Sequence, residues 1–182
     1  MKLFIFYLSC FLAFVGGHMA NYSAIMYSLE VFNSPLLAGL AYGFCFGPPI
    51  IFGWLAGAYI DRYSAKKVLL LAQNFFVLGG MGMFYVMANK PEASVTIFLV
   101  SSFLIGVGWA FVAPSRLAAL GQYVTENKLA QSTIVFNLLV MVGFGLAPIL
   151  LTQIQWAFEW KGVAITSITM FVISSLLLIN AP

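Results

Sequence analysis

Apolar residues run along this chain in six stretches, each about as long as a helix that crosses a lipid bilayer. Such a helix needs about 20 predominantly apolar residues. The criterion predicts one bundle over residues 1–182, with helices at roughly 3–30, 36–60, 66–88, 94–114, 130–152 and 162–180. The predicted fold class is therefore an all-α polytopic membrane protein with six transmembrane helices.

Short polar turns separate the six stretches. The breaks fall at Asn33-Ser34-Pro35 and at residues 61–67, 89–92, 122–128 and 153–161. Proline and asparagine at such points end one helix and begin the next. These turns are too short to form domains of their own, so the sequence predicts helices that follow one another closely.

The first stretch has a second interpretation, because a lysine followed by an apolar run also begins a secretory signal peptide. Here the apolar run continues past His18 to about Leu29. That length exceeds the apolar core of a signal peptide. The prediction is an uncleaved first helix.

Composition supports the membrane interpretation. Only 7% of the residues are charged and 63% are hydrophobic, and the mean hydropathy is +1.02. A soluble domain carries about 25% charged residues. Lipid must therefore cover most of the exterior. The basic residues are scattered through the turns, so the net charge of +3 does not indicate nucleic-acid binding. Cys10 and Cys45 lie in apolar stretches and are predicted to be buried free thiols.

Lysine and arginine are distributed unequally between the two predicted sides of the membrane. One side collects Lys2, Arg62, Lys66, Lys67, Arg116 and Lys128, and the other collects Lys90 and Lys161. Because lysine and arginine are retained on the cytoplasmic side, this asymmetry predicts that both termini are cytoplasmic.

The most informative segment is the charged turn Gly57-Ala58-Tyr59-Ile60-Asp61-Arg62-Tyr63-Ser64-Ala65-Lys66-Lys67. It closely resembles the loop between helices 2 and 3 of the major facilitator superfamily. Four further fragments are similar to the drug- and siderophore-exporter branch of that family, at residues 33–36, 68–73, 114–120 and 136–148. The resemblance covers essentially the whole chain and matches the amino-terminal six-helix half of a twelve-helix transporter.

In the resembled family this loop forms a conformational latch. The resemblance implies the same role here for Gly57, Asp61, Arg62, Lys66 and Lys67. Two residues of the usual pattern, a glycine and an arginine, are replaced in this chain. The alternative role is a topological anchor with a solvated carboxylate, and both roles can hold together.

A substrate cavity is expected around His18, which lies near the middle of the first predicted helix. Ionisable residues at this depth usually face a protein interior or an aqueous cavity. Asn21 and Tyr22 share its helical face. The resemblance adds Trp109 and Asn137, because helices 1 and 4 line the cavity of this fold and helix 5 flanks it. The alternatives are a packed neutral histidine and a tryptophan that faces lipid.

Two further features carry expectations. Arg116 is placed at the cytoplasmic end of helix 4, as an anchor or as an attractor for an anionic group. The second helix carries Pro48-Pro49, which predicts a bend, and a stripe of small residues that would let another helix approach closely. The stripe consists of Gly39, Gly43, Gly47, Gly53 and Gly57. It is either a static contact or a moving interface.

The prediction is a secondary active transporter half that moves a small, amphipathic molecule by alternating access. Export is favoured. The alternatives are an importer or lipid flippase of the same superfamily and a non-transporting membrane assembly or sensor partner. The expected partners are a small-molecule substrate, the lipid bilayer of a bacterial inner membrane, and a second six-helix half in the same full-length chain, a split partner or a homodimer. No enzymatic activity, cofactor, metal site or nucleic-acid partner is predicted.

Overall fold

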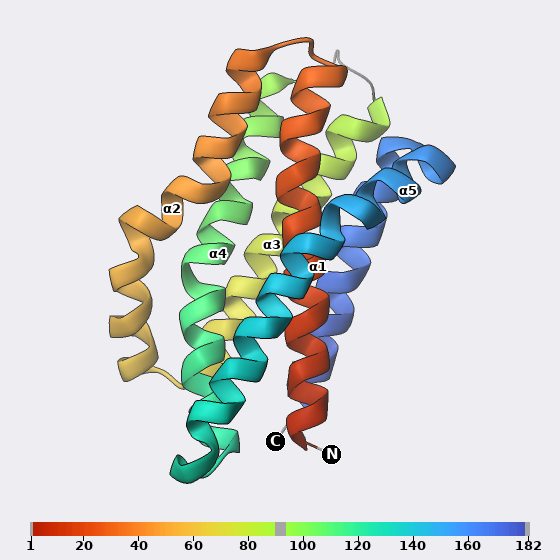
Figure 1. Cartoon of the computed structure of the whole chain (residues 1–182). Coiled ribbons are helices and arrows are strands. Elements are labelled where there is room, and N and C mark those ends of the chain that lie inside the picture. The colour runs from red at the N-terminus through yellow and green to blue at the C-terminus, as the bar shows by residue number, and fades with distance from the viewer. Residues whose placement is uncertain (1, 90–93, 181–182) are drawn as a thin grey trace.

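The computed structural model describes residues 2–89 and 94–180, and within them the chain is helical with no strand. The elements are α1 (Lys2–Glu30), α2 (Pro35–Arg62), α3 (Ala65–Asn89), α4 (Val95–Tyr123) and α5 (Glu126–Asn180). Figure 1 shows them packed side by side as one bundle of long helices. All five are long and apolar enough to cross a membrane. The all-α class is therefore confirmed, and the bounds of α1, α2 and α3 agree closely with the prediction.

The last two predicted helices form one element. α5 is 55 residues long, and only Glu159 inside it leaves helical geometry, with φ 58° and ψ −172°. Figure 1 shows the chain reversing direction in this part of α5. The predicted break at 153–161 therefore contains the reversal, but a single residue with positive φ makes it in place of a nine-residue loop. Two helical stretches meet at that residue.

The turn between α4 and α5 is also shorter than predicted. α4 continues through Pro114 to Tyr123, and α5 already begins at Glu126. By contrast, the break before α2 lies where the sequence placed it. Ser34 accepts a hydrogen bond from the Leu37 amide at 3.2 Å, and a proline opens the helix, as is common at this position. The predicted turn at 89–92 lies mostly outside the described residues.

The predicted bend of α2 is visible in Figure 1, about the middle of the helix. Pro48 and Pro49 lack the amide hydrogens that would bond the carbonyls four residues earlier. One of these carbonyls, that of Phe44, faces α4 at Gly106. A Cβ added at Gly106 would collide with this oxygen and would lie 2.7 Å from Pro48 Cγ. The bend of α2 and the glycine of α4 therefore form one close contact.

Gly106→Ala should destabilise the full-length protein, because the added methyl group must displace backbone as well as side-chain atoms of α2. Overpacking of this kind costs roughly 1–3 kcal/mol. The matched control is Gly121→Ala on the same helix, where an added Cβ meets no atom within 4 Å. Thermal unfolding of the purified variants measures the difference. Equal stability of the two variants would contradict the close contact.

The glycine stripe of α2 has no neighbour within the described residues. A Cβ added at any of its five positions meets nothing within 4 Å. The stripe is therefore not a contact surface inside this bundle, which corrects the expectation that it packs closely here. Sequence spacing shows that a helix has a small-residue face, but it does not show which partner approaches that face.

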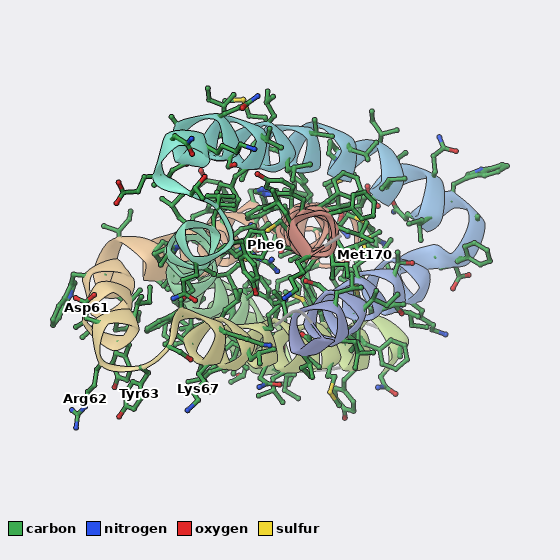
Figure 2. All side chains as sticks on the ribbon, turned by 90° about the horizontal axis from the view of Figure 1, so that it is seen from below. Phe6, Asp61, Arg62, Tyr63, Lys67 and Met170 are labelled. Carbon is green, nitrogen blue, oxygen red and sulfur yellow. The ribbon has the colours of Figure 1, made fainter. Side chains whose placement is uncertain are left out.

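α1 forms the centre of the bundle. The most apolar part of α1 is more deeply buried than the most apolar part of any other described helix. Figure 2, seen from below, shows the other helices around it. Small residues permit close approach on two sides: a Cβ at Gly16 would lie 3.0 Å from Met170 Cβ of α5, and a Cβ at Gly143 of α5 would lie 2.9 Å from Phe14 Cβ. Side chains of α1 are therefore held firmly against both stretches of α5.

Both ends of the chain lie at the same end of the bundle as the α2–α3 and α4–α5 turns (Figure 1). Most residues of the predicted cytoplasmic set belong to these termini and turns. One of them, Lys66, donates a hydrogen bond from Nζ to the Ile179 carbonyl at 3.2 Å. A cation at the carboxyl end of a helix is electrostatically favourable. The contact joins the start of α3 to the end of α5.

Candidate functional site

Three helices bring polar and aromatic side chains together at mid-bundle. We call His18, Asn21, Tyr22, Trp109 and Phe144 the His18 cluster. The His18 ring centroid lies 4.8 Å from that of Trp109 and 4.9 Å from that of Phe144. The rings of Tyr22 and Phe144 are 5.6 Å apart. The first three residues come from α1, the tryptophan from α4 and the phenylalanine from α5.

A glycine positions the tryptophan of this cluster. A Cβ added at Gly17 would lie 2.5 Å from Trp109 Cζ2. A side chain at position 17 would displace the indole, so the glycine beside His18 lets Trp109 approach α1 closely. The indole also stacks on Phe14 at 5.9 Å between centroids. The sequence Gly17-His18 thus places a polar ring and a close contact with α4 at the same level.

The polar atoms of the cluster are buried but incompletely bonded. His18 is 7% exposed and Asn21 is 1% exposed. Asn21 Oδ1 accepts a hydrogen bond from Trp109 Nε1 at 3.4 Å, whereas Asn21 Nδ2 and both ring nitrogens of His18 have no partner among the described residues. Buried polar groups are normally hydrogen-bonded. These three atoms are therefore exceptions to that rule in the part of the chain that the structure describes.

The cluster reaches the surface of the bundle through α5. Phe144 is 50% exposed, and Tyr22 is partly buried. A molecule lying against this face would meet aromatic rings first and the polar atoms of His18 and Asn21 behind them. Such an arrangement suits a molecule with an apolar body and a few hydrogen-bonding groups.

The structure brings four of the five predicted cavity residues together and leaves one apart. Asn137 is exposed on α5 and makes none of the contacts of the His18 cluster. Phe144, seven residues further along the same helix, contacts the histidine instead. The chain has 18 phenylalanines. Because most phenylalanines in an apolar bundle face lipid or core, the sequence does not single out Phe144 as a site residue.

Arg116 is not at the end of its helix and is not exposed. It is 0% exposed, because α4 continues beyond it to Tyr123. Its Nη1 donates hydrogen bonds to Ser9 Oγ at 3.2 Å and Cys10 Sγ at 3.1 Å, and its Nη2 donates to Ser174 Oγ at 2.9 Å. The expected anchoring role at the membrane surface is therefore wrong.

The residues around Arg116 form a second cluster, which we call the Arg116 cluster. Gln73 Nε2 also donates to Ser174 Oγ at 2.7 Å. The hydroxyl oxygens of Ser9 and Ser174 lie 2.8 Å apart. All these partners are uncharged, although a buried charge is costly without compensation. The cluster thus ties α1, α3, α4 and the second stretch of α5 together around one guanidinium.

The two clusters are linked by Phe14. The guanidinium carbon of Arg116 lies 5.8 Å from the Phe14 ring centroid, and the same ring stacks on Trp109. A cation near an aromatic face is electrostatically favourable. Along the contact between α1 and α4, the aromatic ring of Phe14 therefore lies between the polar groups of the two clusters. Both free cysteines, Cys10 and Cys45, are buried, as predicted.

The charged turn is exposed at the end of α2. Asp61 points away from Arg62, Tyr63 and Lys67, which lie on one common side of the molecule (Figure 2). The guanidinium carbon of Arg62 lies 5.7 Å from the Tyr63 ring centroid. Gly57 belongs to the open stripe described above. The latch role of this turn stays a prediction.

Long apolar helices around a central helix with buried, partly unbonded polar groups are typical of membrane proteins that pass solutes. The sequence model of the Major Facilitator Superfamily matches residues 6–182. The chain belongs to that family and is an integral membrane protein. Members of the family are in general transporters without enzymatic activity.

The curated relatives point in the same direction. Macrolide efflux protein A of Streptococcus pyogenes is 22% identical over 152 residues, which cover 84% of this chain and 37% of the relative. The protein of the same name from the serotype M6 strain of that species matches with the same figures. The chain therefore spans well under half the length of the curated relatives that it matches.

Proposed function

We propose that this chain forms the amino-terminal half of a secondary transporter that exports a small, amphipathic molecule by alternating access. The observation that carries the proposal is the His18 cluster, with its buried and unbonded polar atoms behind the half-exposed ring of Phe144. The relative named for macrolide efflux supports export. Import or lipid flipping by the same cluster is the second candidate, and a non-transporting sensor partner is the third.

The proposal includes six membrane spans in this chain and a second six-helix half of the transporter. The two stretches of α5, on either side of Glu159, would be the fifth and sixth spans. The open glycine stripe of α2 suits close approach by another helix. Because the chain covers 37% of its relatives, the second half would belong to the same full-length chain, with a split partner or a homodimer as alternatives.

Transport by the full-length protein tests the function. Inside-out membrane vesicles that contain the protein should accumulate a fluorescent amphipathic dye when energised, and vesicles without it should not. Accumulation in right-side-out vesicles alone would support import and overturn export. A sensor role requires that neither preparation transports any dye of a chemically varied panel.

We further propose that the membrane is a bacterial inner membrane and that both termini are cytoplasmic. Ser64 and Gln155 lie at opposite ends of the bundle, in the α2–α3 turn and near the reversal of α5. In a cysteine-free background, an impermeant maleimide should label Gln155→Cys from outside intact cells and should leave Ser64→Cys unlabelled. The reverse pattern would invert the topology.

A further inference from the structure

α2 and α3 diverge on one side of the bundle and leave a groove with α4 as its floor. The groove has a volume of about 210 Å³. Its walls are apolar and aromatic, and they include Leu55, Tyr59, Val68, Leu71, Phe75 and Phe111. Tyr59 packs edge-on against Phe111 at 6.1 Å between centroids. None of the described residues that line this groove is charged.

The groove continues toward the α2–α3 turn and ends at two cations. Two adjoining hollows, of about 320 and 200 Å³, share Tyr59 and Tyr63 as lining residues. Lys67 lines the first of these hollows and Arg62 lines the second. The lining therefore changes from apolar to aromatic to cationic from the middle of the helices to their ends.

The end of the groove is electrostatically one-sided. Arg62, Tyr63 and Lys67 point to the same side of the molecule, and Asp61 points away from them (Figure 2). Lys67 lies in the first turn of α3, and its amide donates a hydrogen bond to Ser64 Oγ at 3.3 Å. A helix amino terminus adds a partial positive charge. This end of the groove thus favours an anion.

This lining suits an acyl chain along the apolar part of the groove and an anionic headgroup at its cationic end. Tyrosine is common at the level of lipid headgroups, and basic residues near that level attract anionic lipids. We propose that the α2–α3 groove is a binding site for an anionic phospholipid. One acyl chain lies between Tyr59 and Leu71, and the phosphate contacts Arg62 and Lys67. A zwitterionic lipid fits less well, because its ammonium group would add positive charge beside these two cations.

Lipid binding to the full-length protein, purified in a neutral detergent, tests this site. Native mass spectrometry compares dioleoyl phosphatidylglycerol with dioleoyl phosphatidylcholine, which have the same acyl chains. We expect tighter binding of phosphatidylglycerol. The double variant Arg62→Gln/Lys67→Gln should weaken that binding by about fivefold for each cation removed and leave phosphatidylcholine unchanged. The matched control is Lys128→Gln, an exposed cation in the first part of α5.

Further arms separate the groove from general charge attraction. Leu71→Trp should fill the groove and weaken phosphatidylglycerol binding without removing a charge. Soluble glycerol phosphate, which has the anion without the chains, should not compete. The proposal is overturned if the two lipids bind equally, if Lys128→Gln has the effect of the double variant, or if glycerol phosphate competes. It is also overturned if Leu71→Cys cannot be modified in the detergent-solubilised protein, because another part of the transporter then covers the groove.

Discussion

His18→Phe is expected to reduce transport by the full-length protein by about ten- to a hundredfold while the protein still inserts into the membrane. The phenyl ring would occupy the same place between Trp109 and Phe144, which lie within 5 Å of the imidazole between centroids. It would remove both ring nitrogens, and a ligand group left without its partner in a buried site loses about 1–3 kcal/mol. Initial transport rates, normalised to membrane abundance, measure this effect.

Two companion variants give this prediction its controls. His18→Ala should reduce transport less than His18→Phe, because it removes the nitrogens but leaves the space open. Phe4→Ala changes an exposed aromatic residue of the same helix, which is 69% exposed, and should transport like the wild type. If His18→Phe and His18→Ala both transport like the wild type, the imidazole is only a packed part of the core.

The sequence could identify His18 but not its full surroundings. Helical spacing placed Asn21 and Tyr22 on its face correctly, because spacing along one helix is set by local geometry. Contacts between helices depend on packing. The approach of Trp109 follows from the glycine at position 17, a relation that no pattern along the chain reveals. For the same reason the sequence points to Asn137 and does not single out Phe144.

Some helix boundaries can likewise be predicted from the sequence, and others cannot. Turns marked by proline, asparagine or clustered charge were predicted well, because these residues act locally. The reversal of α5 lies inside the predicted break at 153–161, but the sequence does not mark its form: Glu159 adopts φ 58°, although positive φ is uncommon outside glycine and asparagine. The predicted carboxyl end of α4, at residue 114, is too early, because the helix continues through Pro114 and Arg116 to Tyr123. Helix-favouring residues, Leu117 to Leu120, continue the helix beyond both.

That error matters most for Arg116, because a surface anchor and a buried guanidinium respond differently to replacement. Ser9 and Ser174 each donate to the other's backbone carbonyl, at 2.9 and 2.8 Å. Removal of the arginine therefore leaves both hydroxyls bonded. Replacement of a buried charge by an apolar group of similar volume is often neutral or stabilising. Arg116→Met should thus unfold at a temperature equal to or above that of the wild type.

Arg116→Met should nevertheless impair transport, because charges kept inside a membrane bundle at such cost generally serve function. Ser174→Ala should instead reduce the stability of the protein more than its transport. It removes the acceptor of both Arg116 Nη2 and Gln73 Nε2 and should cost roughly 2–4 kcal/mol of unfolding free energy through two unbonded buried donors. Its control is Ser175→Ala, whose hydroxyl donates to the Phe171 carbonyl of its own helix. Thermal unfolding and transport are measured on the same preparations. An Arg116→Met protein less stable than Ser174→Ala, or one that transports normally, would show that the arginine serves packing alone.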